Sequence, residues 1–532
     1  MKSRILTGLA AFFVLLLLLV PDDFAALSPW AILVIPLEAL VGVAVVVFLP
    51  ARARTVVGIV AGVLLGAITI LKLLDLGFGV TLARQFDPLS DWSLFRAASE
   101  WVSESFGKTG AVVAVIVAIL LAIAVPVLAT LSILRLSRVV AVRRSLALRV
   151  VAVLGVAWVV LALLGVHILP GVPIAGRSTA AAAYGHAAQL REDIVDLAAY
   201  DREEQTDAYR DVPSAQLLQG LRGKDVIFAF VESYGRDAVN YPETAALLKS
   251  RSSALAAAGF QAQSGWLTSS TIGGGSWLAH STFQSGLWID SQRRYGRFTE
   301  GSRYTLTTAF SKAGWRTVAV MPANRRDWPE GRVYGFDKEY DDRTLGYKGQ
   351  GYAFSSIPDQ FTLHSFQRTE LARPLPSRQP VMAEIDLLSS HAPWDPVPPM
   401  MDWDTLGDGS TYPGNGGRGG NPGEIDNESA TKVRDNYRRT VEYSVDSLVS
   451  YMEKYGTDNT VLVMLGDHQP SPIITGPDPN RDVPITVIAK DPKVLPRISS
   501  WGWSPGLAPA AEGPVWRMDT FRDRFLGAFA AP

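Results

Sequence analysis

The sequence contains no cysteine, only six histidines and almost no net charge. Without cysteine, the chain has no disulfide, no thiolate metal site and no cysteine nucleophile, and formylglycine cannot be made from it. The 50 basic and 51 acidic residues give a net charge of -1, which argues against a nucleic-acid partner held by overall charge. A metal site in this chain therefore has to use mainly carboxylates and hydroxyls.

Long uncharged runs are confined to the first 170 residues. A helix needs about 20 apolar residues to span a bilayer. Five segments approach or meet this length and predict five transmembrane helices: Ile5–Val20, Ala31–Leu49, Thr55–Leu74, Ala111–Leu134 and Val150–Leu169. We therefore expect a transmembrane domain over residues 1–169, a helical connector over 170–222 and a soluble domain over 223–532.

Basic residues in the short loops predict the orientation of these helices. They precede the first span, join the second to the third, and join the fourth to the fifth: Lys2, Arg4, Arg52, Arg54, Arg135, Arg138, Arg143, Arg144 and Arg149. All three loops fall on the same side, which the positive-inside rule makes cytoplasmic. Five crossings then predict a multi-pass protein of the cell membrane whose C-terminal domain is extracytoplasmic.

The soluble domain has the pattern of an α/β fold. Nearly unbroken apolar runs, typical of buried strands, occur at Asp225–Val231, Trp315–Met321, Val381–Leu388, Thr460–Leu465 and Pro484–Ala489. Helical segments alternate with them, and Thr431–Tyr455 carries an apolar stripe at 3.6-residue spacing. This alternation predicts a mainly parallel sheet. In such sheets ligands bind beyond the carboxyl ends of the strands.

Reactive side chains follow three of these predicted strands. Glu232 comes directly after the first strand, the pair Asp467 and His468 follows Thr460–Leu465 in a Gly-Asp-His motif, and His391 follows Val381–Leu388. A carboxylate, an aspartate–histidine pair and a hydroxyl could together hold one divalent cation through mixed oxygen and nitrogen ligands.

The hydroxyl is expected from a glycine-rich segment between the first strand and the rest. Three glycines, Gly273 to Gly275, run into a predicted helix that begins at Ser276. Glycines let the backbone approach an anion, and a helix start directs its N–H groups toward negative charge. A cation lowers the pKa of a serine hydroxyl and makes it a usable nucleophile. This combination suits phosphoryl transfer.

Together these motifs resemble the alkaline phosphatase/sulfatase superfamily and, within it, the lipoteichoic-acid synthase type of phosphoglycerol transferase. That family has five N-terminal membrane helices followed by an extracellular sulfatase-like domain. The resemblance implies that one divalent cation, Mn²⁺ as first choice with Mg²⁺ or Zn²⁺ as alternatives, is held by Glu232, Ser276, Asp467 and His468. It further implies that Ser276 is the nucleophile and that His391 contacts the transferred phosphoryl group.

The sequence departs from the family pattern in places. The family nucleophile is usually threonine, so Ser270, Thr271 and Ser281 remain alternatives to Ser276. The residues expected to hold glycerol phosphate are Trp328 and Arg332, with Arg325 or Arg326 as substitutes. His280 lies one helical turn after Ser276, where it could orient the nucleophile or meet a phosphoryl oxygen, or simply be a histidine satisfied within the fold.

The function implied is a membrane transferase that moves glycerol phosphate from phosphatidylglycerol to a cell-envelope glycan or glycolipid through a covalent seryl intermediate. Alternatives are a phosphoethanolamine transferase, a phosphodiesterase, or a catalytically silent envelope-binding protein with the same fold. A true sulfatase is disfavoured because the residues after Ser276 lack the proline and arginine needed for formylglycine conversion. The glycine-rich segment Trp403–Glu428 is expected to be a linker or a lid.

Overall fold

The computed structural model describes residues 2–22, 28–82, 84–169, 172–352, 357–413, 429–476 and 479–531. The chain divides into two compact units, Met1–Asp196 and Leu197–Pro532. The boundary between them falls inside helix α6 (Ser178–Gln205), within the segment expected to be a connector. The three-part division at residues 169 and 222 stays a prediction.

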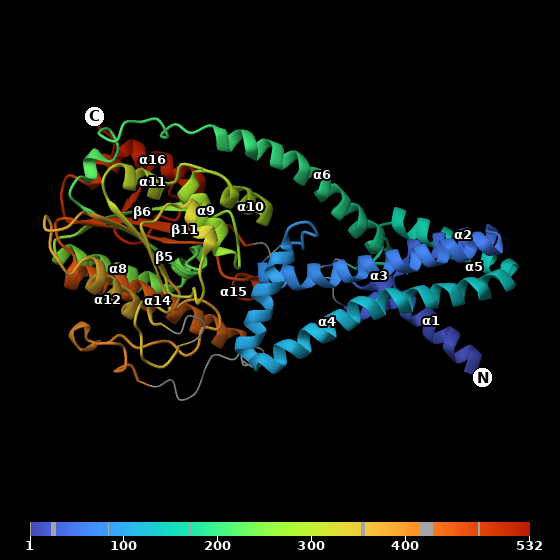
Figure 1. Ribbon diagram of the computed structural model, residues 1–532. Coiled ribbons are helices and arrows are strands. Elements are labelled where there is room, and N and C mark those ends of the chain that lie inside the picture. Colours follow the sequence, from blue (N-terminus) through green and yellow to red (C-terminus); the bar gives the residue numbers. More distant parts are fainter. Residues whose placement is uncertain are drawn as a thin grey trace. The chain divides into compact units, whose positions relative to one another are not determined.

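The first unit is almost entirely helical (Figure 1). Its helices before α6 are α1 (Lys2–Leu19), α2 (Leu37–Phe48), α3 (Ala51–Leu82), α4 (Leu94–Val142) and α5 (Arg144–Leu163). Two short ribbons accompany them: β1 (Ile35–Pro36) pairs with β4 (Ala175–Gly176), and β2 (His167–Leu169) pairs with β3 (Val172–Pro173). Helix α4 is interrupted at Gly107, whose φ of 75° is incompatible with a continuous helix.

Three helices among the described residues are long and apolar enough to cross a membrane: Ala51–Leu82, Gly107–Val142 and Arg144–Leu163. The other two predicted spans correspond to the shorter apolar helices Ser3–Leu19 and Leu37–Phe48, so the five-helix count is not confirmed. Pro36 is the N-cap residue of α2, so this helix begins at Leu37 and is shorter than the predicted second span. The last predicted span ends at Leu163, and His167 lies in strand β2 rather than within a membrane helix.

A row of glycines brings α3 and α4 into close contact. Gly58, Gly62 and Gly66 recur every four residues on α3 and face α4. A Cβ atom on Gly62 would lie 2.3 Å from the Thr130 Cα, and one on Gly66 would lie 2.4 Å from the Pro126 Cα. Small residues at this spacing are what allow membrane helices to pack backbone against backbone.

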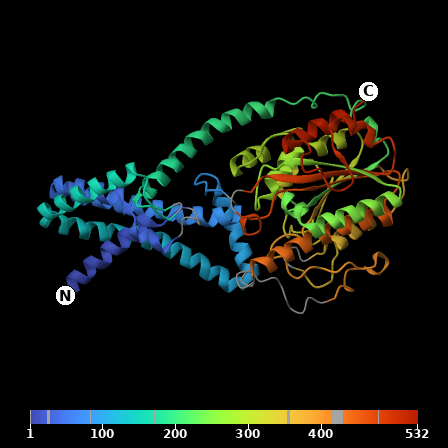
Figure 2. The same ribbon diagram turned by 180° about the vertical axis from the view of Figure 1, so that it is seen from behind.

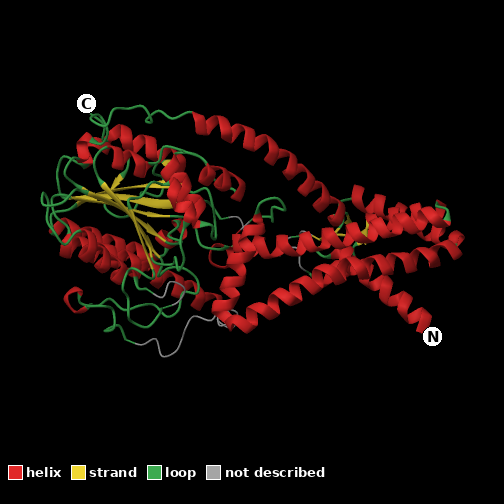
Figure 3. Ribbon diagram, in the orientation of Figure 1, coloured by secondary structure: helices red, strands yellow, loops and turns green. Residues whose placement is uncertain are grey.

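The second unit is built on one sheet with helices on both faces (Figures 1 and 3). Within the described residues the sheet has nine strands: β5 (Asp225–Val231), β6 (Gln261–Thr268), β7 (Arg316–Met321), β8 (Lys338–Asp341), β9 (Val381–Leu387), β10 (Thr460–Gly466), β11 (Asp482–Ala489), β12 (Ser504–Pro505) and β13 (Val515–Arg517). Their order is β12-β6-β11-β10-β5-β9-β7-β8, with β13 paired to β6.

The direction of the strands corrects one prediction. The five strands from β10 to β8 are parallel to one another, whereas β11 is antiparallel to β10 and to β6, and β12 is antiparallel to β6. The sheet is therefore mixed, and the prediction of a mainly parallel sheet describes only the part from β10 to the β8 edge. The antiparallel edge includes β6, whose polar start, Gln261 to Ser264, gave no strand signal in the sequence.

The helices of this unit form two layers that sandwich the sheet, as both the front and the rear views show (Figures 1 and 2). They are α7 (Arg236–Asn240), α8 (Pro242–Ala257), α9 (Ser276–Ser285), α10 (Gln292–Glu300), α11 (Leu306–Lys312), α12 (Asp359–Glu370), α14 (Ala430–Tyr455), α15 (Pro472–Thr475) and α16 (Phe521–Ala528). Alternate residues of β5 face opposite layers: Ile227 packs with α8, α12 and α14, and Phe228 packs with α9, α11 and α16. The central strand is thereby buried on both faces.

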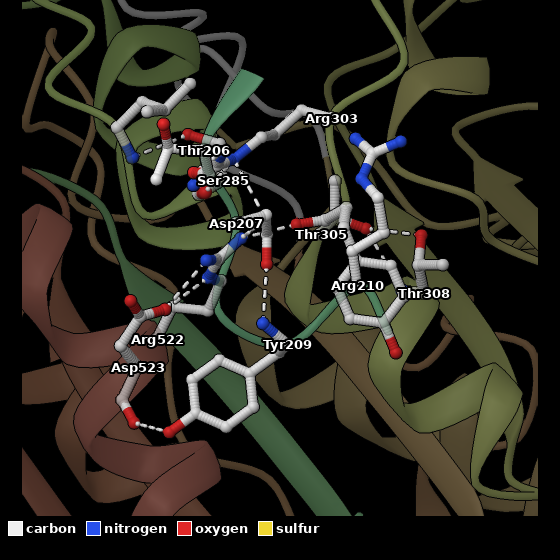
Figure 4. Close-up of polar contacts among 12 residues, drawn as sticks. Thr206, Asp207, Tyr209, Arg210, Ser285, Arg303, Thr305, Thr308, Arg522 and Asp523 are labelled. Carbon is white, nitrogen blue, oxygen red and sulfur yellow. Dashed lines mark hydrogen bonds and ion pairs between the residues drawn. The ribbon is translucent and has the colours of Figure 1, made fainter. Parts of the chain in front are cut away.

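A buried ion network ties the start of this unit to its last helix (Figure 4). The Asp207 carboxylate lies 2.9 Å from Arg522 Nη1 on α16 and 3.3 Å from Arg303 Nε. Tyr209 completes the link by donating its hydroxyl to the Asp523 carbonyl at 2.9 Å. The side chains of Asp207 and Arg522 are at most 1% exposed, so their charges are compensated within this network, which also includes the Asp523 carboxylate at 2.7 Å from Arg522 Nη2, rather than by water.

Candidate active site

Two central strands deliver the carboxylates of the site. Strand β5 lies between β10 and β9 and is parallel to both, with Val231 opposite Gly466 and Leu387. Glu232 and Asp467, the first residues after β5 and β10, therefore emerge side by side at the same edge of the sheet. Asp467 is followed directly by His468, and all three side chains are buried.

The hydroxyl comes from the amino end of α9. Gly273, Gly274 and Gly275 have φ values of 72°, 157° and 76°, a backbone course that is strained for residues with a Cβ. The N–H of Gly273 donates to the Gln469 carbonyl at 2.9 Å, which fixes this loop to the turn that follows His468. Helix α9 then begins at Ser276, as predicted, and places that residue in its first turn.

The four predicted ligands converge. Ser276 Oγ lies 3.2 Å from Glu232 Oε2 and 3.1 Å from His468 Nε2. His468 Nε2 in turn lies 3.3 Å from Asp467 Oδ2 and 3.5 Å from Glu232 Oε1. The carboxylate oxygens and the imidazole nitrogen all lie within 4.8 Å of one another.

These separations fit a cation. Donor atoms that share an ion at about 2.1 Å are themselves about 3.0 to 3.5 Å apart. Two carboxylates, a hydroxyl and an imidazole nitrogen form a donor set suited to Mn²⁺, Mg²⁺ or Zn²⁺. The residues present therefore fit the divalent ion that the sequence implies.

The charges within the cluster also favour a bound cation. Burial and the neighbouring Glu232 carboxylate raise the pKa of Asp467. Burial alone would also raise the pKa of Glu232, but the imidazoles of His468 and His391 and the Ser233 hydroxyl lower it. Two buried carboxylates in contact are stabilised as anions by a positive charge between them.

His391 belongs to the surroundings of this cluster. It follows β9, its Nδ1 lies 2.5 Å from the Ala392 carbonyl, and it is one of the neighbours that lower the pKa of Glu232. The neighbouring Ser390 hydroxyl donates to the Glu232 carbonyl at 2.5 Å, so the β9 loop and the β5 loop are directly bonded. Its role as a phosphoryl contact stays a prediction.

His280 lies one turn after Ser276 and is held by buried groups. Its Nδ1 lies 2.8 Å from Glu384 Oε1 and 3.6 Å from Asp386 Oδ1 on β9, and its ring stacks on Phe230 at a centroid distance of 3.9 Å. Burial would lower the pKa of His280, but Asp386 and Glu384 raise it to about 9. The structure thus gives this histidine carboxylate partners that the sequence analysis did not identify.

The other predicted substrate residues make contacts of a different kind. Trp328 packs on Tyr334 at a centroid distance of 5.2 Å, and the exposed Arg332 donates its Nε to the Pro329 carbonyl at 3.2 Å. Their assignment to glycerol phosphate stays a prediction. In the segment Trp403–Glu428, residues 414–428 lie outside the described part of the chain, so the expectation of a linker or lid also stays a prediction.

The alternatives to Ser276 have other partners. The hydroxyl of Thr271 donates to the Gly274 carbonyl at 2.6 Å, and that of Ser281 donates to the Trp277 carbonyl at 2.6 Å. Ser270 accepts a hydrogen bond from Thr282 at 3.0 Å. Among these hydroxyls, all of which lie in the part of the chain that the structure describes, that of Ser276 is the one in contact with Glu232 and His468.

Comparisons with known proteins give structural likenesses only. No family model matches the chain, and no curated protein matches it. Solved structures similar to it include the lipoteichoic acid synthase LtaP from Listeria monocytogenes, with 16% identity, a TM-score of 0.35, and coverage of 50% of this chain and 66% of that one.

Two further solved structures are similar. The lipooligosaccharide phosphoethanolamine transferase EptA from Neisseria meningitidis has 14% identity and a TM-score of 0.45, over 94% of this chain and 87% of that one. The Streptococcus pyogenes phosphoglycerol transferase GacH has 16% identity and a TM-score of 0.34, over 56% and 74%. These are the kinds of protein that the sequence resembles. At such identities and TM-scores, the function of this chain has to be argued from its own residues.

Proposed function

We propose that this chain is a membrane-anchored, metal-dependent phosphotransferase that moves glycerol phosphate from phosphatidylglycerol to a cell-envelope glycan or glycolipid. The observation that carries the proposal is the convergence of Ser276, Glu232, Asp467 and His468 at the carboxyl edge of the sheet. A hydroxyl at a helix start, beside two buried carboxylates and an imidazole, is the arrangement expected for a phosphoryl-accepting nucleophile.

The proposed reaction is a double displacement. Ser276 Oγ attacks the phosphorus of the lipid, the bond from phosphorus to the diacylglycerol oxygen breaks, and that oxygen takes up a proton as diacylglycerol leaves. An acceptor hydroxyl then attacks the same phosphorus, the bond to Ser276 breaks, and the proton lost by the acceptor balances the one that restores the Ser276 hydroxyl. A bound divalent ion would favour ionisation of the hydroxyl and stabilise charge on the phosphoryl oxygens.

The chain's own residues would do the rest. The N–H groups in the first turn of α9 are directed toward the anion, as at other helix starts. His391, in the loop after β9, and His280, one turn after Ser276, are the proposed contacts for the phosphoryl oxygens. Trp328 and Arg332 are the proposed contacts for the glycerol moiety. The complete set of converging groups supports an enzyme over a silent binding protein.

The proposed location is the cell membrane, with five crossings and the second unit outside the cytoplasm. The three long apolar helices support membrane anchoring, and the distribution of basic residues supports the side. The donor would then be reached in the outer leaflet.

The function is tested by trapping the covalent intermediate. Purified full-length protein is incubated with labelled phosphatidylglycerol or phosphatidylethanolamine and Mn²⁺, and the peptide containing Ser276 is weighed by mass spectrometry. We expect an added glycerophosphate group, absent in Ser276→Ala and present in Ser276→Thr, which keeps the hydroxyl.

Other outcomes distinguish the alternatives. An added phosphoethanolamine group would replace the proposed donor by phosphatidylethanolamine. Release of a hydrolysed headgroup without transfer would indicate a phosphodiesterase. No modification with either lipid, in protein shown to contain metal, would contradict the proposed reaction.

A further inference from the structure

Ser233 adopts a backbone conformation that is unusual for its residue type. It follows Glu232, is 6% exposed, and has a φ of 56°, in the left-handed region that residues with a Cβ rarely occupy. Among the described residues other than glycine, only Leu218 shares this property. Strained residues persist where the surrounding structure holds them, and they cluster at functional sites.

The conformation lets one residue bond to both carboxylates of the cluster. The Ser233 hydroxyl donates to Glu232 Oε1 at 2.7 Å, and its backbone N–H donates to Asp467 Oδ1 at 2.8 Å. Glu232 and Asp467 come from different strands, so Ser233 couples two parts of the site that the sheet alone only brings near each other.

These bonds decide which oxygen of each carboxylate is available. With Oε1 of Glu232 taken by Ser233, Oε2 lies 3.2 Å from Ser276 Oγ. With Oδ1 of Asp467 taken, Oδ2 lies 3.3 Å from His468 Nε2. Ser233 thus restrains one oxygen of each carboxylate, while Glu232 Oε2 faces Ser276 and Asp467 Oδ2 faces His468. The His468 N–H also donates to Asp467 Oδ1 at 2.8 Å, and Glu232 Oε1 lies 3.5 Å from His468 Nε2.

Ser233 is itself held from a third element. Tyr437 on α14 is fully buried and donates its hydroxyl to the Ser233 carbonyl at 2.7 Å. The N–H of Gly235 donates to the same carbonyl at 3.0 Å. The strained peptide is therefore fixed at its N–H, its side chain and its carbonyl.

We propose that Ser233 is a positioning residue that presets Glu232 and Asp467 for binding a divalent cation, with Tyr437 as its support. This inference rests on the proposed metal-dependent function. Groups that hydrogen-bond to metal ligands typically change metal affinity by about 10- to 100-fold when removed. We expect a loss in that range for Ser233→Ala, which keeps the Cβ and the backbone N–H and removes the hydroxyl.

The test measures Mn²⁺ binding to full-length protein in detergent after chelator treatment. Ser233→Ala and Ser233→Gly should both bind Mn²⁺ 10- to 100-fold more weakly. Ser233→Thr, which keeps the hydroxyl, should bind Mn²⁺ more tightly than Ser233→Ala does, although it should melt below wild type because a β-branched residue is strained at this φ. The metal-free Gly variant should melt at a higher temperature than the Ala variant, because glycine accepts a φ of 56° without strain.

A matched control distinguishes the positioning of the metal ligands by Ser233 from the general effect of removing a buried hydroxyl. Ser264 on β6 is fully buried, and its hydroxyl bonds to that of Thr486 at 2.8 Å. Ser264→Ala should leave Mn²⁺ affinity at the wild-type value whatever its effect on melting. Tyr437→Phe should weaken Mn²⁺ binding less than Ser233→Ala does.

The outcomes distinguish this inference from the proposed function. Wild-type protein that binds neither Mn²⁺ nor Zn²⁺ would overturn both. Wild-type binding together with equal affinity in Ser233→Ala would overturn the role of Ser233 and leave the metal site intact. Equal losses in the Ser233 and Ser264 variants would also overturn it, because the effect would then be a general one.

Discussion

Glu384 offers a direct way to test the charge beside the proposed nucleophile, Ser276. Its side chain is 1% exposed and accepts hydrogen bonds from His280 Nδ1 at 2.8 Å and from Gln284. With Asp386, it holds the pKa of His280 at about 9 against an ordinary value of 6.5. This difference corresponds to roughly 3 kcal/mol of favourable interaction with the imidazolium.

The sign of the effect follows from the raised pKa. A group whose pKa is higher in the folded state stabilises that state fully below its unfolded value and loses this contribution as pH rises through its folded value. For His280 the loss should therefore occur between about pH 6.5 and pH 9. Glu384→Gln removes one of the two carboxylate charges, so the pKa of His280 should fall and the loss should begin at lower pH.

Histidine NMR provides the assay, because six histidines make selective labelling tractable. His280→Gln assigns the resonance, and the pH titration of wild type and Glu384→Gln then gives the two pKa values. His364 on α12 is an internal control whose titration should not change. The rate of the proposed transfer reaction should begin to fall at a lower pH in Glu384→Gln than in wild type. A wild-type His280 titrating at or below 6.5 would refute the reasoning.

Two further substitutions test the packing of each unit. Gly62→Leu should lower the melting temperature of the detergent-solubilised protein, because its Cβ would lie 2.3 Å from the Thr130 Cα, whereas Gly77→Leu on the same helix, with nothing within 4 Å, should have little effect. Asp207→Asn removes the buried counter-charge of Arg522 and leaves it the half-exposed Asp523 carboxylate at 2.7 Å, so it should cost about 3 kcal/mol in unfolding free energy, the low end for a broken buried pair, measured by denaturant titration. An unchanged value would contradict this account of the ion network.

The sequence predicted the parts of the site that strand order determines. Glu232 and Asp467 each follow an unbroken apolar run, and parallel neighbouring strands necessarily bring such residues to one edge. The start of α9 at Ser276 could be predicted because three consecutive glycines interrupt any regular structure.

The sequence did not predict the residues that surround these groups. Glu384 and Asp386 lie within an apolar strand, where period-two alternation does not show which side chains meet a histidine from another helix. Ser233 carried no signal either, because a positive φ in a serine is imposed by contacts such as that with Tyr437. In the first unit, length alone could not separate a full span from a short apolar helix such as Leu37–Phe48.

A second group of side chains could also hold a cation. His280, Glu384 and Asp386 also offer three donor atoms within 4.8 Å. However, His280 Nδ1 and Glu384 Oε1 are at hydrogen-bond distance, and Phe230 covers the ring, so a proton already joins these two atoms.

The cluster of Glu232, Asp467 and His468 differs because Ser233 donates hydrogen bonds to both of its carboxylates. We therefore expect one equivalent of metal per chain by elemental analysis, lost in Glu232→Gln and retained in Glu384→Gln. Two equivalents, one of them lost in Glu384→Gln, would show that the histidine group is a second metal site and that the charge assigned to His280 is wrong.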